Sequence, residues 1–519
     1  MRNLIHLDIL TLSLFVVISL MAQNVKADIQ SHYYPGLIQQ QDSDTNDVPD
    51  WSEPVGFASI DGDNFVGPVT GGGEIVTSDN IVYINGPSEF TKLVTLLYDR
   101  IKAYKNKSDY LSAKYAPLII VLEEGMYAAS GEIPNTGSVW GNSMLAIQDQ
   151  GDLTMIGRGD VILNFGINVK RSWNILIRNI GFQDYYDDGI NIGEPETHHV
   201  WIDHCTFGNP TEMPADSEHP DGGCDIKNGT SYITISWCLF RNNWKTSLIG
   251  HSDNNGDTDI GRLKVTFYCN YFKHSNSRQP RVRFGEVHVL NCFYDNTMLY
   301  GIASANSAKV YAEGNFFLNT VFPMYADRTE ADFAAVYGPL ESYTGNYPCI
   351  GLKQINNLYD DSGLSTILTG SFVNVNVLNP GNKSIKFDEL NPESVFEPAS
   401  YYDYEALNAA SVPVLVKKYA GAGAVDFFIV DNTGNISVNK GPDQTRTIFP
   451  NPAADIIYVS TAVNSKLKIL NTNGKIVLEK TISFSPQNIN INEAGLKPGF
   501  YLIIIENKSG IMTSRLLIM

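Results

Sequence analysis

A short pattern that returns at nearly regular intervals constrains this chain more than any other feature. Each copy is a small, polar or aliphatic residue, then any residue, then an aromatic one. The copies are Ile180–Phe182, Cys205–Phe207, Cys238–Phe240, Asn270–Phe272, Cys292–Tyr294 and Asn315–Phe317. They follow one another at steps of about 25, 33, 32, 22 and 23 residues, which is the period of a solenoid coil. The repeat therefore predicts a stack of coils.

Each of the later copies follows a short run rich in β-branched and aromatic residues. These runs are Val200–Asp203, Tyr232–Ser236, Lys264–Phe267, Val287–Leu290 and Lys309–Ala312. Such runs read as strands. One coil cannot bury its apolar face alone, so strand must stack on strand, and we predict an all-β chain folded as a parallel β-helix. The two longer steps predict inserted loops, which build the binding face in solenoids.

The charge of the chain limits its partners. The net charge is −19 and the sequence pI is about 4.9. This balance argues against nucleic acid or an anionic membrane surface as the partner. It does not exclude an anionic substrate, because the local field at a site matters more than the sum over the chain.

The amino terminus has the form of a secretory signal. A basic residue precedes the apolar run Ile9–Met21, and Val25–Ala27 offers a cleavage site with small residues. The alternative is a membrane anchor, but about 13 apolar residues are few for a span. We expect residues 1–27 to be a signal peptide, residues 28–430 to form the β-helix domain, and no segment to span a membrane. A helix from Ser88, capped by that residue, should cover the first coil.

Six cysteines in an exported chain raise the possibility of disulfides. Four of them, Cys205, Cys238, Cys269 and Cys292, lie at or beside the repeated position. On stacked coils their side chains would run parallel, which is poor disulfide geometry. Buried free thiols are the favoured interpretation.

The character of the sequence changes near Thr447. After a linker at residues 431–446, short alternating runs separated by Asn-Gly and Pro-Gly turns predict a small antiparallel β-sandwich at 447–519. Its motifs are Phe449–Pro452, Asn473–Lys475, Gly499–Tyr501 and Leu516–Ile518. In these it resembles the C-terminal sorting domain of type IX secretion substrates. The resemblance implies recognition by the type IX secretion machinery and export to the surface or exterior of a Gram-negative cell. The alternative, a carbohydrate-binding sandwich, is disfavoured because the segment has no Trp.

Carboxylates cluster near the longer steps. Asp188 precedes the run Ile190–Ile192, and Asp221 and Asp225 flank a Gly-Gly pair before the next coil. In a parallel stack the starts of successive strands are neighbours, so these three side chains can meet. Crowded carboxylates need a cation, and oxygen ligands favour Ca²⁺ over Mg²⁺. A solvated acidic rim is the alternative.

Basic residues concentrate just beyond them. Between Arg241 and Gly285 there are eight Lys and Arg but only three Asp, a local charge of +5 in a chain of −19. A positive patch beside a cation site predicts a groove for a polyanion. The alternative is a solvated stripe of charge along the coils.

Several ordered motifs together carry a family resemblance. They are Val200–His204, Asp221–Lys227, Tyr232–Ser236, Lys245–Gly250 and Arg278–Gly285. In their order and spacing the chain resembles the pectate lyases of polysaccharide lyase family 1. The resemblance implies a right-handed parallel β-helix and is densest from Asn174 to Asn296.

Site roles follow from the resemblance position by position. Asp188, Asp221 and Asp225 match the Ca²⁺ ligands, and Asp187 stays open as a further ligand because some relatives carry two acids in this motif. Lys245 and Arg283 match cations that bind the substrate, and Arg278 matches the catalytic base. Asp203 and His204 belong to the signature, but we expect them to pack and hydrogen-bond beside Trp201.

The resemblance implies a secreted or cell-surface enzyme, expected to be a monomer, that cleaves polygalacturonate by Ca²⁺-dependent β-elimination. Removing the C5 proton places a second negative charge beside a carboxylate, and cations offset it. Arginine is normally charged, so a crowd of neighbouring cations is needed to favour its neutral form. The alternatives are a pectin lyase, a polygalacturonase-type hydrolase on the same fold and a β-helical protein that binds pectin without cleaving it.

Overall fold

The computed structural model describes residues 51–73, 80–105, 117–128, 144–326, 349–360 and 389–425, and in the C-terminal part 427–430, 436–438, 456–459, 465–471, 475–482, 487–491, 494–507 and 510–518. The chain divides into two compact units, and the boundary falls between Asp426 and Phe427. The expected signal peptide and most of the expected linker lie outside the described residues. Among the helices that are described, none is long and apolar enough to cross a membrane.

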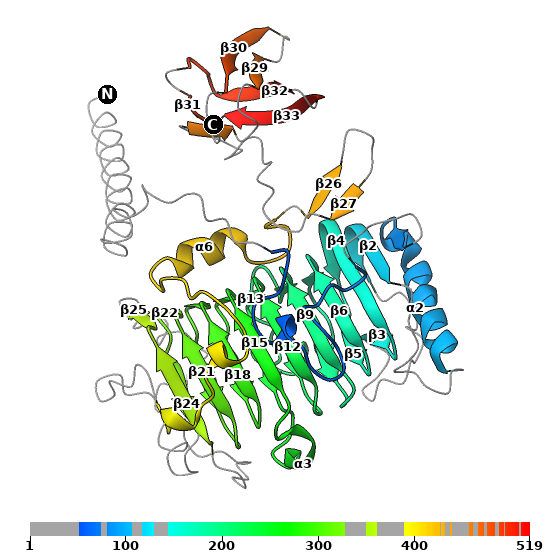
Figure 1. Cartoon of the computed structure of the whole chain (residues 1–519), viewed down its shortest axis with the longest axis vertical. Helices are drawn as coiled ribbons and strands as arrows, with labels where there is room; N and C mark the ends of the chain where they lie inside the picture. Colours follow the sequence, from blue (N-terminus) through cyan, green and yellow to red (C-terminus); the bar gives the residue numbers. More distant parts are fainter. Residues whose placement is uncertain are drawn as a thin grey trace, which may run out of the picture. The chain divides into compact units, whose positions relative to one another are not determined.

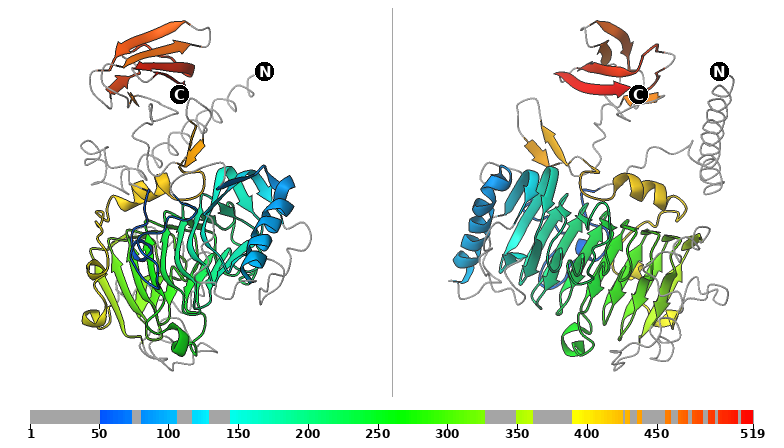
Figure 2. Two further views of the ribbon diagram at one scale, coloured as in Figure 1. Left: turned by 45° about the vertical axis from the view of Figure 1, so that its right-hand side comes forward. Right: turned by 180° about the vertical axis from the view of Figure 1, so that it is seen from behind.

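The first unit is a right-handed parallel β-helix, which confirms the fold class predicted from the repeat (Figure 1). The longer, 17-stranded sheet contains β1 (Ile81–Ile84), β2 (Leu118–Tyr127), β4 (Gly151–Leu163), β6 (Trp173–Arg178), β7 (Gly181–Phe182), β9 (His198–Asp203), β10 (Thr206–Phe207), β12 (Ser231–Ser236), β13 (Leu239–Arg241), β15 (Lys264–Tyr268), β16 (Tyr271–Lys273), β18 (Glu286–Leu290), β19 (Phe293–Asp295), β21 (Lys309–Glu313), β22 (Phe316–Leu318), β24 (Gly351–Ile355) and β25 (Leu358–Asp360). The eight-stranded sheet contains β3 (Met144–Gln148), β5 (Gly166–Lys170), β8 (Ile190–Gly193), β11 (Cys224–Ile226), β14 (Leu248–Ile249), β17 (Arg281–Val282), β20 (Tyr300–Ser304) and β23 (Phe322–Ala326). Figure 2 shows these strands stacked coil upon coil from two further directions.

Corresponding strands pair in parallel register, so one kind of side chain returns at one place in every coil. Val200 pairs with Ile233, Ile233 with Val265, and Val265 with Val287. All four side chains are fully buried. β-Branched residues suit such a half-buried pleated surface, and their repetition extends one apolar core along the whole stack.

The aromatic residue of the repeat forms a continuous ring stack inside the helix. The members are Phe182, Phe207, Phe240, Phe272, Tyr294 and Phe317. Their centroids follow one another at 5.0, 4.8, 5.1, 4.9 and 4.3 Å with nearly parallel rings. Offset stacking at these distances adds to the stability gained by burying each ring. Each copy of the repeat in the sequence therefore contributes one ring to this stack.

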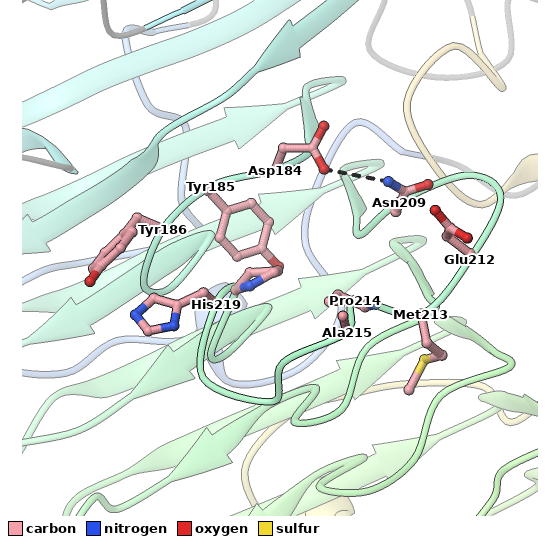
Figure 3. A pocket seen from close by; sticks show the side chains of 10 residues that line it. Asp184, Tyr185, Tyr186, Asn209, Glu212, Met213, Pro214, Ala215 and His219 are labelled. Atoms are coloured by element: carbon pink, nitrogen blue, oxygen red, sulfur yellow. Dashed lines mark hydrogen bonds between the residues drawn. The ribbon is translucent and has the colours of Figure 1, made fainter. Parts of the chain in front are cut away.

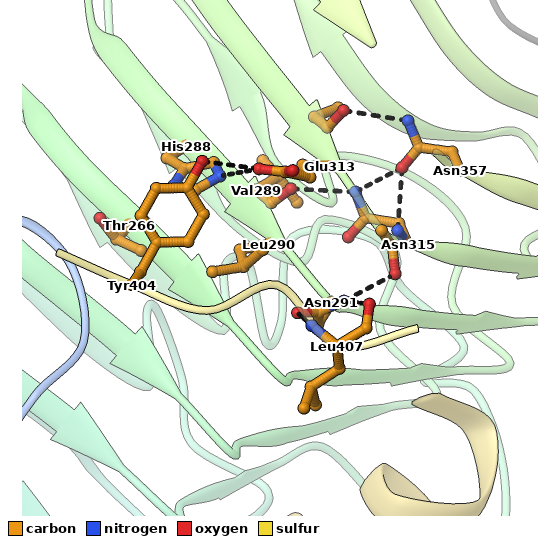
Figure 4. A network of polar contacts seen from close by, with 12 residues as sticks. Thr266, His288, Val289, Leu290, Asn291, Glu313, Asn315, Asn357, Tyr404 and Leu407 are labelled. Carbon is orange, nitrogen blue, oxygen red and sulfur yellow. Dashed lines mark hydrogen bonds and ion pairs between the residues drawn. The ribbon is translucent and has the colours of Figure 1, made fainter. Parts of the chain in front are cut away.

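A turn of the chain, here called the corner, precedes each copy of the repeat. The hydrogen bonds at this corner explain which residue types begin the pattern. The residue that precedes each copy has a left-handed backbone, with φ of 48° at His204, 51° at Trp237 and 53° at Asn291. The buried turn then leaves an N–H that needs an acceptor from the next coil. Asn270 Oδ1 accepts from Cys238 N at 2.9 Å, and Asn315 and Asn357 make the same contact two and three coils further along (Figure 4).

Cysteine occupies the same corner on other coils. The Cys205 N–H donates to Cys238 Sγ at 3.4 Å, so a thiol takes the place of the amide oxygen. All six cysteines are free and buried, which confirms the interpretation as small buried thiols. Burial raises the pKa of the Cys292 thiol to about 12 and so keeps it protonated.

A helix covers the first coil. The turn η2 (Pro87–Glu89) leads into α2 (Phe90–Lys105), whose residues Phe90, Leu93 and Leu97 join the main core. Figure 1 shows α2 beside β2 and β3 at the end of the stack. The expected capping role of Ser88 is wrong, because this residue lies inside the 3-10 turn and makes no side-chain cap.

Two segments from the ends of the unit pack on the outer face of the longer sheet. The turn η1 (Phe57–Ser59) donates from Phe57 N to Thr266 Oγ1 at 3.0 Å. The later segment, with η4 (Pro392–Ser394), η5 (Pro398–Ser400) and α6 (Val412–Tyr419), places Tyr404 Oη 2.7 Å from Glu313 (Figure 4). These contacts cover the outside of the middle coils on the side of the longer sheet.

The second unit is built from antiparallel strands, as predicted. A four-stranded sheet runs in the order β30 (Ile476–Thr481), β29 (Lys466–Asn471), β32 (Gly499–Asn507) and β33 (Gly510–Ile518), and β28 (Ile456–Val459) pairs with β31 (Gln487–Asn490). Val459, Ile469 and Ile503 share one core. The sequence did not predict the full length of β33, an edge strand whose middle is polar, nor the pair β26 (Phe428–Val430) and β27 (Ile436–Val438), which reaches into the expected linker.

Asp203 is the centre of a buried polar network in β9. Its carboxylate lies 2.8 Å from Arg178 Nε and 2.7 Å from His204 Nδ1, and Ser236 Oγ donates to it at 2.6 Å. The Arg178 guanidinium lies over the Trp201 ring. Burial alone would raise the pKa of Asp203, but His204 and Arg178 outweigh burial and hold that pKa below its usual value. The network is structural, as we expected for Asp203 and His204.

We predict that Asp203→Asn lowers the free energy of unfolding of the first unit by about 3–5 kcal/mol, because it leaves the buried Arg178 charge without its counter-ion. Urea denaturation at pH 7 measures this. A carboxyl group with a depressed pKa stabilises the fold above its unfolded pKa of about 3.9 and loses that contribution as the pH falls, so the difference from wild type should shrink in acid. Asp160→Asn, exposed on β4, is the matched control. Equal losses in both variants would contradict the structural role.

Candidate functional site

The six predicted site residues lie on or beside four neighbouring strands of the eight-stranded sheet. Asp188 precedes β8, Asp225 lies in β11, Lys245 precedes β14, and Arg278 and Arg283 flank β17. Asp225 pairs with Asn191, and Leu248 with Arg281, in parallel register. Side chains alternate across a strand, so the buried Cys224 and Ile226 point into the core while Asp225 points to the opposite, outer face.

An acidic group forms where β8 and β11 begin. Carboxylate oxygens of Asp187, Asp188 and Asp221 all lie within 4.8 Å of one another. The backbone holds them there, since Asp221 N donates to Asp187 O at 2.9 Å and Gly222 N donates to Asp188 Oδ1 at 3.1 Å. The structure thus brings Asp187, which the sequence left open, into the same group as the predicted Asp188 and Asp221.

Asp225 lies beside this group, across Gly222, although the three carboxylates that lie within 4.8 Å of one another do not include it. A Cβ atom placed on Gly222 would lie 2.6 Å from Asp188 Oδ1 and 2.6 Å from Asp225 Oδ1. The two oxygens are therefore no farther apart than twice that distance, and any side chain at position 222 would collide with both. Leu248 N donates to Asp225 Oδ1 at 3.0 Å and fixes its direction. Glycine at 222 is what lets the carboxylates converge.

Burial and mutual repulsion raise the pKa values in this group. Burial, then the charge of Asp188, raises the pKa of Asp187 to about 6 and that of Asp225 to about 8. Burial also raises the pKa of Asp188, although Lys227 opposes the change from 3.3 Å. Carboxylates held this close are unfavourable as anions unless positive charge lies among them. The group has the oxygen ligands and the charge that suit a divalent cation.

Lys245 lies on the far side of the same acids. Its Nζ is 2.8 Å from Asp221 Oδ1 and 2.5 Å from Glu218 Oε1. Its backbone bridges Gly222 on one side and Ser277 on the other, so it occupies the coil between the acidic group and Arg278. The ammonium group predicted to bind substrate is thus partnered by acids in this structure.

Arg278 occupies a strained position at the start of the next coil. Its φ is 59°, in the left-handed region, and Ser247 N donates to its carbonyl at 2.7 Å. The positive charge of Arg278 is a smaller influence on the pKa values of Asp225, Glu218 and Arg283, behind burial at Asp225 and Arg283 and behind the hydrogen bond from Lys245 at Glu218. Backbone strain of this kind persists where the surroundings hold it, as at functional sites.

The Arg283 side chain is held by contacts within the protein that the sequence did not predict. Its Nε pairs with Asp253 and its Nη1 donates to Gly250 O at 2.9 Å. Burial, then the charge of Arg281, lowers the pKa of Arg283. Asp253 belongs to the loop inserted between β14 and β15, one of the two insertions that the longer steps predicted.

The sequence missed three residues that complete the site. Lys227 neutralises Asp188, Glu218 partners Lys245, and Tyr185 is a buried phenol whose hydroxyl has no hydrogen-bond partner among the described residues. Lys227 could have been found, because it lies two positions after Asp225 and so on the same face of the strand. Glu218 and Tyr185 lie on turns whose path the repeat does not determine.

The fold and this site define a class of β-helical protein in which an acidic group that could hold a cation adjoins a row of basic side chains on successive coils. The profile of the family described as "Pectate lyase" matches residues 49–424. The chain belongs to this family. A second profile, described as "Secretion system C-terminal sorting domain", matches residues 447–519, so the C-terminal segment is a sorting domain that directs export.

Relatives support the family assignment. The chain is 32% identical over 301 residues to a pectate trisaccharide-lyase of Thermotoga sp. strain RQ2, a match that covers 53% of this chain and 73% of that protein. It is 34% identical over 211 residues to a probable pectate lyase A of Neosartorya fischeri, covering 38% of this chain and 64% of that protein. It thus spans less than two thirds of such fungal relatives. The crystal structure of a pectate lyase of Bacillus sp. N165 in complex with trigalacturonate aligns with a TM-score of 0.49 at 23% identity, over 72% of this chain and 99% of that one.

We predict that Ca²⁺ raises the melting temperature of the wild-type protein and that Gly222→Ala abolishes this rise. The added methyl group would occupy the space between Asp188 and Asp225 and displace a bound ion. Thermal melts with increasing CaCl₂, and with chelator as the reference, measure the shift. Gly193→Ala in β8 is the matched control, since its Cβ makes only ordinary contact at 3.7 Å. An undiminished shift in the Gly222 variant would place the ion elsewhere.

Proposed function

We propose that this protein is a Ca²⁺-dependent lyase that cleaves the α-1,4 bonds of polygalacturonate, the de-esterified form of pectin, by β-elimination. One observation carries the proposal. The acidic group lies on the coils next to those of Lys245, Arg278 and Arg283, so a cation site and three positive side chains face one binding surface. A neutral polysaccharide needs no such charge, whereas a polyuronate has a carboxylate on every sugar.

The acidic group fits Ca²⁺. Asp187, Asp188 and Asp221 offer only oxygen ligands within 4.8 Å of one another, and Asp225 lies beside them across Gly222, which has no side chain to separate them. Ca²⁺ accepts six to eight such ligands in flexible geometry, whereas Mg²⁺ demands a tight octahedron. When bound, the ion supplies positive charge that offsets both the aspartates and a substrate carboxylate.

The residues of the chain account for the remaining chemistry. Lys245 and Arg283 hold the uronate carboxylate next to the scissile bond, which makes the adjacent C5 hydrogen more acidic. Arg278, in its neutral form, takes the C5 proton. The C5–H electron pair becomes the C4=C5 double bond as the C4–O bond breaks, and the departing oxygen takes a proton from solvent. Water is not added across the bond.

The cationic surroundings favour this role for Arg278. Arg281 and Arg283 lie on the same coil, and the charges of Arg281 and Arg278 both lower the pKa of Arg283, behind the larger effect of burial. Repulsion of this kind is mutual and favours loss of a proton from one of the group. We assign the proton transfer to Arg278 because this residue matches the catalytic base of the family motif.

The alternatives fit the site less well. An inverting hydrolase needs two carboxylates about 6.5–9.5 Å apart with water between them. Oxygens of Asp187, Asp188 and Asp221 lie within 4.8 Å, and burial favours a cation among them. A pectin lyase, which acts on methyl esters, has no need of these carboxylates. Simple adhesion needs no strained arginine between two acids.

The ends of the chain suggest a route to the cell exterior. We propose that a signal peptide at residues 1–27 directs the first export step and that the type IX secretion machinery recognises residues 447–519, with residues 431–446 as the linker. The mature protein then meets its substrate outside the cell as a monomer. The sorting-domain profile supports the second step.

Ultraviolet absorbance during incubation with polygalacturonate tests the main proposal. We expect a rise from the new C4=C5 double bond that disappears with chelator and returns with added Ca²⁺. New reducing ends without absorbance would indicate a hydrolase instead. A rise in absorbance that persists in chelator would show that the reaction does not need Ca²⁺.

We predict that Arg278→Ala lowers kcat by at least about 10²–10⁴-fold, the contribution typical of a general base. The fold and the Ca²⁺-induced rise in melting temperature should remain. Lys273→Ala, exposed on β16 of the same coil, is the control and should keep near wild-type activity. Substantial turnover in the Arg278 variant would assign the proton transfer to another group.

Deleting residues 447–519 should retain the protein inside the cell without changing its specific activity. The reason is that the deleted unit has its own core and contributes no residue to the site. Immunoblots of medium, surface and periplasmic fractions from a host with type IX secretion measure the distribution. Unchanged export of the shortened protein would contradict a sorting role.

A further inference from the structure

A pocket of about 400 Å³ opens beside the acidic group (Figure 3). Its walls come from two successive coils: the turn that precedes β8 and the loop that joins β10 to β11. The lining residues are Asp184, Tyr185, Tyr186, Asn209, Glu212, Met213, Pro214, Ala215, His219 and Pro220. The loop from Asn209 to Pro220 is the first of the two insertions in the repeat, and the role proposed above for the site uses only Glu218 from it. A pocket of this size suits one or two sugar residues.

The pocket shares a wall with the proposed reaction site. The ring of Tyr185 lines it, and the charges of Asp188 and Asp225 act on the Tyr185 hydroxyl. His219 lines the other side, and its charge acts on Asp187. A polysaccharide bound at the acidic group can therefore place a neighbouring sugar in this pocket.

The charge of the pocket is opposite to that of the rest of the binding surface. Asp184 and Glu212 line it, and no Lys or Arg is among its lining residues. Lys245, Arg278 and Arg283 all lie on the later coils, beyond the acidic group. A galacturonate carboxylate placed here would face the carboxylates of Asp184 and Glu212. His219, the one lining residue that can carry positive charge, is already paired with Asp216, 2.9 Å away, so the arrangement disfavours a further anion. The pocket is therefore built for an uncharged sugar.

The other walls suit such a sugar. Tyr186, 62% exposed, and His219 lie with ring centroids 4.3 Å apart and ring planes tilted by 51°, and together they form an aromatic wall. Met213, Pro214 and Ala215 form an apolar side, and Trp244 Nε1 donates to Pro214 O at 2.8 Å, which ties this loop to the next coil. Asp184 and Glu212 can accept hydrogen bonds from sugar hydroxyls. Figure 3 shows Asn209 donating to Asp184, at 3.4 Å.

We propose that this pocket binds a methyl-esterified galacturonosyl residue of the same pectin chain, next to the de-esterified sugar held at the acidic group. The inference rests on the proposed function and specifies its substrate as partly esterified pectin. The ester has no charge to be repelled by Asp184 and Glu212, and its methyl group matches the apolar side formed by Met213 and Pro214. The enzyme would then cleave where an esterified sugar adjoins a free one.

Charge reversal at the rim of the pocket tests this. One pectin sample, partly esterified, is assayed before and after saponification with the wild-type protein, Glu212→Lys and the control Glu393→Lys, an exposed acid of η4. We expect Glu212→Lys to lower the ratio of kcat/KM on esterified to saponified pectin by about two- to fivefold, the effect of one exposed charge. The control should leave the ratio unchanged. Melting curves confirm that both variants are folded.

Product analysis gives an independent measurement. Mass spectrometry of the wild-type products should show methyl esters enriched at one fixed position from the unsaturated end, and Glu212→Lys should lose this enrichment. Esters excluded from every position near the cut, or a ratio that does not change in Glu212→Lys, would overturn the proposal. If neither polymer is cleaved, the proposed function fails instead. Calorimetric binding of trigalacturonate and its methyl ester to the wild-type protein then decides: preference for the ester supports the pocket, and equal or weaker binding refutes it.

Discussion

Pairing between equivalent positions of successive coils is the interaction on which the structure depends. Each corner places a residue in the left-handed region and buries a backbone N–H that only the next coil can satisfy, through Asn270, Asn315 or a cysteine thiol. The ring stack from Phe182 to Phe317 also requires this register, because each aromatic ring must lie over the equivalent ring of the next coil. A coil out of register would leave its corner unsatisfied and open a gap in the stack, so register is specified twice on every coil.

This register also builds the site. Neighbouring strands lie about 4.7–4.9 Å apart, so acidic residues at equivalent positions of adjacent coils come together whether or not their charges favour it. Asp187 and Asp221, each three residues before the register pair Ile190 and Cys224, meet in this way, and the raised pKa values of Asp187 and Asp225 express the repulsion. Lys227 and Lys245 offset part of it. The scaffold thus holds an unfavourable group of charges ready for a cation, and a flexible loop would let them separate.

How far the sequence predicts this protein depends on whether a feature repeats. The strands, the buried thiols and the meeting of Asp188 with Asp221 follow from a pattern that each coil restates. Features specific to one coil were harder to predict. Ser88 was expected to cap a helix, but that helix begins with a 3-10 turn. The pairing of Arg283 with Asp253 was not predicted, because it depends on the path of one inserted loop. Strand β33 was underestimated because an edge strand has no need of apolar residues in its middle. The proposed roles of Lys245, Arg278 and Arg283 still depend on their match to family motifs.

The loop from Asn209 to Pro220 begins at the end of one strand of the stack and ends before the start of another, so its length and composition can change without disturbing the pairing on either side. The carboxylates of the neighbouring coils belong to the strands and their immediate flanks and do not share this freedom. Selection can therefore change the loop without changing the carboxylates of the neighbouring coils. Descendants of one ancestral coil stack can diverge in the decorations of pectin that they tolerate by exchanging a dozen loop residues, while the ligands inherited with the strands stay in place.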